Sequence, residues 1–184
     1  MKRLVIILIL ISLFISSFGQ TVSNQKPPLR ERIFFGGSFG LQFGTITNIN
    51  VSPIVGVWVL PRVAIAAGPS FQYYADPFGK TFIYGGTTYL QLTILRDLNN
   101  ILPIGLHLGI FGQLEYEGLS LEKSYITQMP DEHGRVYSNA ILLGPGISQS
   151  MGGRASLNLS FLWALNQSEY IEYGSPEIRV SFTF

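Results

Sequence analysis

Large apolar and small or polar side chains alternate along most of the chain after residue 32. The alternation is clearest near residue 160, where one face carries Leu157, Leu159, Phe161, Trp163 and Leu165 and the other carries Ser156, Asn158, Ser160 and Asn166. A period of two is typical of β-strands, because successive side chains point to opposite faces of a sheet. The pattern predicts eight strands, at about residues 33–44, 48–59, 63–74, 82–95, 102–117, 136–148, 156–166 and 177–184.

The connections between the expected strands alternate in length. Residues 60–62, 96–100 and 149–154 form short turns, whereas residues 76–80, 118–135 and 167–175 are mostly longer and more polar. The first connection, near residues 45–47, is short and departs from this trend. Short turns on one side and longer loops on the other are typical of outer-membrane barrels, whose short turns face the periplasm. An even number of strands also brings both ends of the barrel to the periplasmic side.

The first 19 residues predict a secretory signal peptide that is cleaved before Gln20. A basic start at Met1-Lys2-Arg3 precedes an apolar run from residue 4 to residue 15, and Ser17-Phe18-Gly19 offers the small residues that a signal peptidase reads. A transmembrane anchor is the alternative, but roughly a dozen apolar residues are too few to cross ~30 Å of hydrocarbon. Residues 20–32, which contain Pro27-Pro28, are expected to form a periplasmic tether without fixed structure. Residues 33–184 form the barrel.

The composition favours a barrel in a membrane over one in water. Hydrophobic residues make up 47% of the chain and charged residues only 12%, about half the usual charged share. After the signal, no apolar run approaches the ~20 residues of a spanning helix, and lipid otherwise admits only closed barrels. The polar face is rich in Gly, Ser, Thr, Asn and Gln and too poor in Lys and Glu for a solvated exterior. We therefore expect it to face the lumen; a secreted, lipocalin-like soluble barrel with the faces reversed is the alternative.

Charge and cysteine content exclude several other classes of protein. Loss of Lys2 and Arg3 takes the basic count from 12 to 10 against 11 acidic residues, so clustered positive charge for nucleic acid is not expected. The absence of cysteine excludes disulfides, thiolate metal sites and an acylated N-terminal cysteine. Aromatic residues near strand ends fit the interfacial girdles of a membrane barrel; they are Tyr73, Tyr84, Tyr116, Trp163, Phe182 and Phe184.

The last six residues carry a resemblance to a known family. They read Arg179-Val180-Ser181-Phe182-Thr183-Phe184, with apolar or aromatic residues at alternate positions and a terminal Phe. This ending resembles the signal by which outer-membrane barrels are recognised for insertion, and the mature chain resembles the small, eight-stranded outer-membrane β-barrel proteins of Gram-negative bacteria. The resemblance implies folding by the outer-membrane assembly machinery, through Phe184, and implies no particular activity.

Four charged residues fall on the expected inward face and predict a polar network in the lumen. Glu115, Glu117 and Glu177 share this face with Arg179, the only basic residue expected there, at similar heights toward the outer half of the barrel. We expect Arg179 to contact at least one glutamate, because an unpaired buried charge is costly. Two carboxylates could instead serve glycoside hydrolysis, but that chemistry needs an open cleft.

Two histidines suggest chemistry only weakly. His107 is expected on the inward face as part of the lumen network; with a serine and Glu115 it could form a hydrolase triad, but it would face away from lipid and no nucleophile-elbow motif is present. His133 follows Asp131-Glu132 in a loop, which is a weak pattern for a divalent cation. We expect neither a catalytic residue, nor a metal, nor a cofactor.

The sequence thus predicts an all-β, antiparallel, up-and-down transmembrane barrel with a structural or interaction role. Its outer loops, residues 118–135 and 167–175, would display a surface to a protein partner, while the lumen is filled and does not conduct. A lipid-modifying enzyme of the outer membrane is the alternative. A small pore is disfavoured, since eight strands leave no aqueous channel.

Overall fold

The computed structural model describes residues 27–42, 47–77, 79–103, 105, 107–124, 133–166 and 176–184. The predicted signal and the first part of the tether lie outside these residues, as do residues 125–132 and the expected loop at 167–175. Within the described residues, no helix is long and apolar enough to cross a membrane.

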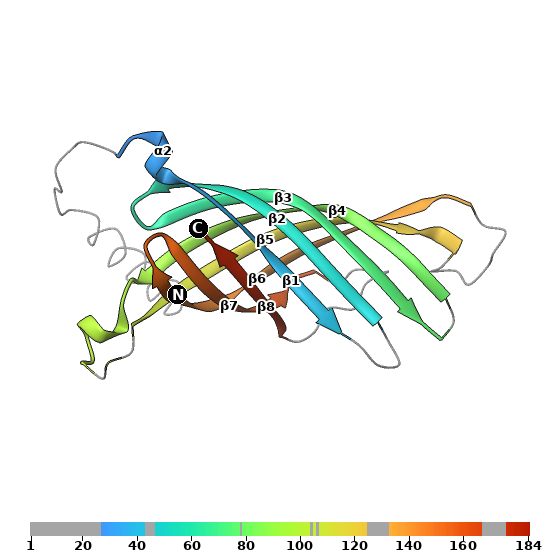
Figure 1. Cartoon of the computed structure of the whole chain (residues 1–184). Coiled ribbons are helices and arrows are strands. Elements are labelled where there is room, and N and C mark those ends of the chain that lie inside the picture. The colour runs from blue at the N-terminus through green and yellow to red at the C-terminus, as the bar shows by residue number, and fades with distance from the viewer. Residues whose placement is uncertain are drawn as a thin grey trace, which may run out of the picture.

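Eight antiparallel strands close into a barrel in the order of the sequence, as the alternation predicts (Figure 1). The strands are β1 (Ile33–Gln42), β2 (Thr47–Leu60), β3 (Val63–Asp76), β4 (Gly79–Leu95), β5 (Leu108–Glu122), β6 (Arg135–Gly152), β7 (Ala155–Ala164) and β8 (Glu177–Thr183). β1 and β8 complete the ring, with Gly37 opposite Phe182. Phe35 and Phe184 exchange two backbone hydrogen bonds of 2.9 and 2.8 Å beside this pairing. Closure removes the exposed sheet edges that would otherwise pair with other chains.

The two ends of the barrel differ. At the end that we call the turn end lie the start of β1, Phe184 and the connections β2–β3, β4–β5 and β6–β7. The opposite end is called the loop end. Figure 1 shows the short helix α2 (Leu29–Arg32) at the turn end, while the β5–β6 hairpin reaches farthest at the loop end. Both ends of the barrel-forming sequence therefore lie on the same side, as an even strand number requires.

Side chains alternate between the lumen and the exterior in the predicted parity. In β7, Asn158 and Ser160 are buried inside, while Leu159 and Phe161 are on the opposite face. Throughout the barrel the outward face exposes large apolar side chains, among them Phe35, Phe39, Val51, Val55, Ile65, Phe71, Leu90, Leu92, Leu114, Ile141, Leu143, Val180 and Phe182. The inward face buries small polar side chains such as Ser52 and Ser70, whose hydroxyl oxygens lie 3.0 Å apart.

The predicted bounds of the fifth strand are wrong at both ends. β5 begins at Leu108, and the 3-10 helix η1 (Leu98–Asn100) lies before it in the chain. The Asp97 carboxylate caps η1 by accepting a hydrogen bond of 2.9 Å from the Asn99 N–H. β5 also continues to Glu122, and β6 already begins at Arg135, so the intervening loop is shorter than expected. The inward face becomes apolar here, where Leu119 and Leu121 cluster with Ile83. Because the alternation of apolar and polar residues stops at this point in the sequence, the strand was predicted to end too early.

The expected tether also departs from the prediction. Its last four residues form α2 instead of lacking structure. The Nε of Arg32 donates a hydrogen bond of 2.7 Å to the carbonyl oxygen of Trp58, which joins α2 to the end of β2. The short helix is therefore held over the turn end of the barrel.

Candidate functional site

An ion-paired cluster spans the middle of the lumen. Arg179 on β8 forms ion pairs with Glu115 and Glu117 on β5, and its Nη2 lies 3.1 Å from the Glu117 Oε2. The side chains of Arg179, Glu115 and Glu117 are only 18%, 3% and 4% exposed. β6 and β7 separate the two strands around the ring on one side, and β1 to β4 separate them on the other. The cluster therefore crosses the interior, and we call these three residues the crossbar.

The strand geometry explains why these residues meet. Glu115 and Glu117 are two positions apart on β5, so both point to the same face of the sheet. Glu115 lies beside Tyr89 of β4 and Glu117 beside Thr87 in the strand register, and all four side chains are buried. An arginine is long enough to reach across an interior that is only as wide as its filling side chains.

Neutral polar groups complete the environment of Glu115. Its Oε1 accepts a hydrogen bond of 2.9 Å from the Thr87 hydroxyl, and its Oε2 accepts one of 2.7 Å from the Gln113 side-chain amide. The Ser160 hydroxyl in turn donates to Gln113 Oε1 at 3.1 Å. Such bonds are what make a buried charge tolerable, since the same group without partners would carry its full desolvation cost.

Glu177 and His107 are the other two residues that the sequence predicts in the lumen network, and they lie in different places. Glu177 is half-buried at the start of β8, two positions before Arg179, and its charge acts on that guanidinium. His107 lies outside the lumen, so its prediction is wrong: its side chain is 61% exposed, and its Nδ1 lies 2.8 Å from Asp97 Oδ2. Because β5 begins only at Leu108, the strand alternation does not extend to His107. His107 and Glu115 therefore do not share a site.

The Asp97–His107 pair belongs to the connection between β4 and β5. The hydrogen bond from His107, followed by that from the Asn99 N–H, lowers the pKa of Asp97 below its ordinary value. The Asn99 side chain also accepts a hydrogen bond of 2.8 Å from the N–H of Gly105, whose φ is +76°. A left-handed conformation of this kind is accessible to glycine at little cost. This connection is therefore an ordered turn.

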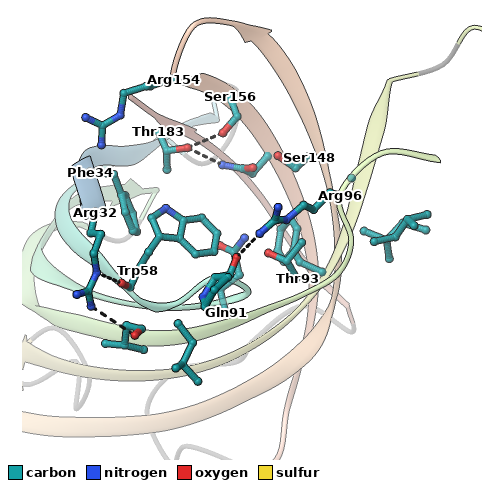
Figure 2. Close-up of a pocket in the computed structure, with 18 of the residues that line it drawn as sticks. Arg32, Phe34, Trp58, Gln91, Thr93, Arg96, Ser148, Arg154, Ser156 and Thr183 are labelled. Carbon is teal, nitrogen blue, oxygen red and sulfur yellow. Dashed lines mark hydrogen bonds between the residues drawn. The ribbon is translucent and has the colours of Figure 1, made fainter. Parts of the chain in front are cut away.

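A chamber opens between the crossbar and the turn end. It is a cavity of about 820 Å³, in which Phe34, Trp58 and Phe111 supply aromatic surface. Figure 2 shows the Trp58 indole in the middle of the opening, with Arg32, Arg96 and Arg154 at separate points around it. Beside the crossbar itself only about 30 Å³ of space remains. The lumen was expected to be filled; it is filled at mid-height and hollow at the turn end.

The chamber exists because two aromatic rings occupy the space beside glycines of neighbouring strands. A Cβ atom at Gly56 would overlap the ring of Phe34, and one at Gly146 would overlap the ring of Phe111. Each glycine stands directly opposite its phenylalanine in the strand register. The alternation of side chains does not predict this site. The signal that the sequence offers is that the arginines at positions 32, 96 and 154 all lie beside predicted turns or strand starts.

The weak cation pattern around His133 gains no further ligand from the fold. His133 is exposed, and Asp131 and Glu132 lie outside the described residues. Among the residues that the structure describes, no three His, Asp or Glu side chains are grouped so that they could hold a metal ion.

Comparisons with protein-family models, with curated proteins and with solved structures found no match to this chain. The fold and the site define its class on their own: a small, closed, eight-stranded antiparallel β-barrel whose interior is crossed by buried ion pairs.

Proposed function

We propose that the protein is an outer-membrane β-barrel with a structural or interaction role. The observation that carries this proposal is the inversion of its surfaces: large apolar side chains cover the outside of a closed barrel, while charged and hydroxyl side chains are buried within it. A soluble barrel would place these faces the other way round. Lipid is the solvent in which such an exterior is stable, and closure satisfies the backbone groups that lipid cannot.

The height of the apolar belt supports the same proposal. On the outward face of β5, Leu114 and Tyr116 are followed by Gly118, Ser120 and Glu122 toward the loop end. On this strand the apolar outward face ends before the loop end, as expected where a bilayer of limited thickness ends, at an interface that favours aromatic side chains such as Tyr116. Secretion through the predicted signal and insertion through the Phe184 ending belong to this proposal.

Blockage of the lumen favours a role other than that of a pore. The crossbar spans the interior, and Leu142, opposite Glu115, and Leu162, opposite Glu177, fill space at this height with side chains that are almost completely inaccessible. A path for water or ions would have to break the ion pairs or displace these side chains. We propose that the lumen does not conduct.

The β5–β6 hairpin offers the surface for a protein partner. Tyr137 on this hairpin is 75% exposed. Two positions closer to the loop, Arg135 fixes the hairpin, because it lies 4.1 Å from the centre of the Tyr84 ring and donates hydrogen bonds of 2.7 and 2.6 Å to the side chain and backbone of Ser120. An exposed tyrosine on a hairpin that is held in place by side-chain contacts is typical of a binding surface, where tyrosine often contributes much of the affinity.

Membrane insertion is tested by extraction and by gel mobility. We expect the mature chain to leave outer membranes only with detergent, and its gel mobility to change on heating because the closed barrel otherwise survives. Release by carbonate or salt washing, without a heat-dependent shift, would contradict the membrane proposal.

A charge placed on the exterior separates the membrane barrel from a soluble one. Leu159 lies halfway along β7 on the outward face. Leu159→Arg should lower the free energy of unfolding by ~2–4 kcal/mol in a bilayer, where the charge lies near the midplane. In water the same change on an outward side chain would cost less than ~0.5 kcal/mol. Denaturant unfolding from vesicles measures the difference, and Leu159→Ala controls for the loss of the side chain.

The interaction role is tested on complexes extracted from the membrane. We expect the barrel to migrate as part of a larger complex in mild detergent, and Tyr137→Ala to release it from that complex while the heat-dependent mobility shift is retained. Migration as a free barrel, together with altered lipid A on overproduction, would contradict an interaction role and favour a lipid-modifying enzyme.

A further inference from the structure

We propose that the chamber at the turn end is a binding site for an amphipathic anion, a molecule with one apolar chain and one carboxylate or phosphate head. The apolar chain would lie among Phe34, Trp58 and Phe111, and the head would lie at the opening among Arg32, Arg96 and Arg154. This inference goes beyond the proposed function, which assigns the partner surface to the opposite end of the barrel.

Within the described residues, the three arginines at the opening outnumber the acidic residues that line the chamber. Arg32 donates to the carbonyl oxygens of Trp58 and Val59, and Arg96 donates to that of Pro61 at 2.8 Å. Arg154 donates to the carbonyl oxygens of Glu31 and Ile33. None of these three forms an ion pair with a carboxylate of the described chain, in contrast to Arg179. Among the described residues that line the chamber, Glu31 is the one acidic residue.

Backbone anchoring leaves these guanidinium groups ready to bind an anion. Each guanidinium has five N–H donors in a fixed plane, and the bonds to carbonyl oxygens use one or two of them while fixing the orientation of the group. Charge-assisted bonds to carboxylate or phosphate oxygens are stronger than those to neutral acceptors. An anionic head therefore gains bonds at the opening without the side chains first having to be ordered.

The apolar wall and the volume of the chamber favour a ligand with an apolar chain over a small inorganic anion. Phe34 and Trp58 form an aromatic pair with ring centroids 6.0 Å apart, and Leu95, Ile110 and Phe111 extend the apolar surface. The volume of about 820 Å³ lies within the ~300–1,000 Å³ that is usual for small-molecule sites. Inorganic phosphate would leave this surface and most of this volume unused.

The two tryptophans of the chain provide the measurement. Trp58 lines the chamber, whereas Trp163 is exposed on the outward face near the other end of β7. The full barrel is reconstituted in zwitterionic vesicles as Trp163→Phe, which retains Trp58, and as Trp58→Phe, which retains Trp163. A medium-chain carboxylate with a terminal bromine quenches a nearby indole, and the brominated alcohol of the same length is the neutral probe.

We expect the carboxylate to quench Trp58 saturably and with at least about tenfold higher affinity than the alcohol, the gain typical of a charge-assisted bond. Quenching of Trp163 should be unsaturable and equal for the two probes, since it reports partitioning into the bilayer. Added salt should weaken only the saturable binding. If quenching of Trp58 gave equal affinities for the carboxylate and the alcohol, the proposal would be overturned. This test needs no arginine variant. Equally strong competition by inorganic phosphate and by the alkyl carboxylate would also overturn it.

Arginine variants locate the head group. Arg96→Gln combined with Arg154→Gln should weaken carboxylate binding by about tenfold or more. Arg62→Gln is the matched control, because Arg62 also lies at the turn end and donates to a backbone carbonyl, at 3.2 Å from the Ile94 oxygen, but does not line the chamber. It should change the affinity by less than about twofold, since an exposed charge contributes little. Equal losses in the two variants would overturn the assignment of the head group.

Discussion

The two halves of the lumen differ in the burial and in the partners of their arginines. At mid-height, Arg179 is buried against two carboxylates, and almost no free space remains beside it. At the turn end, Arg96 and Arg154 are exposed, bind only backbone carbonyls among the contacts that the structure describes, and border a chamber of about 820 Å³. Arginine therefore helps to fill the lumen at mid-height and lines an open chamber at the turn end.

The difference shows that strand number alone does not determine whether a narrow barrel is filled. Eight strands enclose an interior that side chains can just fill, and at the crossbar they do so. Where Phe34 and Phe111 fold onto Gly56 and Gly146, their volume is taken up at the wall and the centre stays open. The placing of glycines on neighbouring strands therefore decides which height of the lumen is hollow.

Removal of the crossbar cation should have the largest effect on stability. Arg179→Met leaves Glu115 and Glu117 without their cation in a buried site. We expect the free energy of unfolding to fall by ~3–5 kcal/mol, as is usual when one partner of a buried pair is removed. A further Glu115→Gln change should recover part of the loss, because it removes one stranded charge.

The matched control for this experiment is Arg62→Met at the turn end. Arg62 is exposed and makes no ion pair within the described chain, so the expected change is below ~0.5 kcal/mol. Denaturant unfolding of the single and double variants gives the coupling energy. A double-mutant cycle that shows no coupling between Arg179 and either glutamate would mean that the ion pairs of the crossbar do not contribute to stability. The two halves of the lumen would then not differ in the energetic role of their arginines.

Substitutions of two inward-facing serines test more directly how tightly each half of the lumen is packed. Ser160 is 3% exposed and bonded to Gln113 near the crossbar, whereas Ser148 lines the chamber. Ser160→Leu should lower the free energy of unfolding by ~1–3 kcal/mol, because a packed interior has no room for the added carbons. Ser148→Leu should change it by less than ~0.5 kcal/mol while reducing the quenching of Trp58 by the brominated carboxylate. Equal losses of stability would mean that the chamber is not open in the folded protein.

The period-two pattern was sufficient to predict most of the barrel. Strand number, order and the facing of residues such as Leu159 and Ser160 follow from it, because a shift of one residue would turn a whole apolar face inward. The same parity predicted that Arg179 and the two β5 glutamates share the lumen. Alternation does not encode where a strand begins or stops. Leu119 and Leu121 are apolar on the inward face although β5 continues through them, and the alternation of residues 102–107 predicted an earlier start than Leu108.

The chamber could not be predicted in this way. It depends on which residues of two neighbouring strands stand opposite one another, such as Phe34 and Gly56. The sequence of one strand does not give its register with the next, so a glycine that accepts an aromatic ring cannot be told from one that serves a turn. His107 was misplaced for a related reason, because the ordered turn that holds it depends on side-chain bonds from Asp97 and Asn99.

The smallest expected effect concerns Asp97 and His107, an exposed pair that contrasts with the buried crossbar. The hydrogen bond from His107 and then that from the Asn99 N–H lower the pKa of Asp97 below its ordinary value of 3.8. A carboxyl group with a lowered pKa in the folded state stabilises that state above the ordinary pKa, and this contribution is lost as the pH falls through the lower value. His107→Ala, which removes the side-chain donor, should therefore move the pKa of Asp97 up toward 3.8, with part of the shift retained because the Asn99 N–H remains. Titration of the Asp97 carboxyl by NMR measures the change, and high salt should reduce it, since exposed charges are screened. An unchanged pKa in His107→Ala would show that the Asn99 N–H alone holds the carboxylate, and that the contact between Asp97 and His107 does not act as an ion pair.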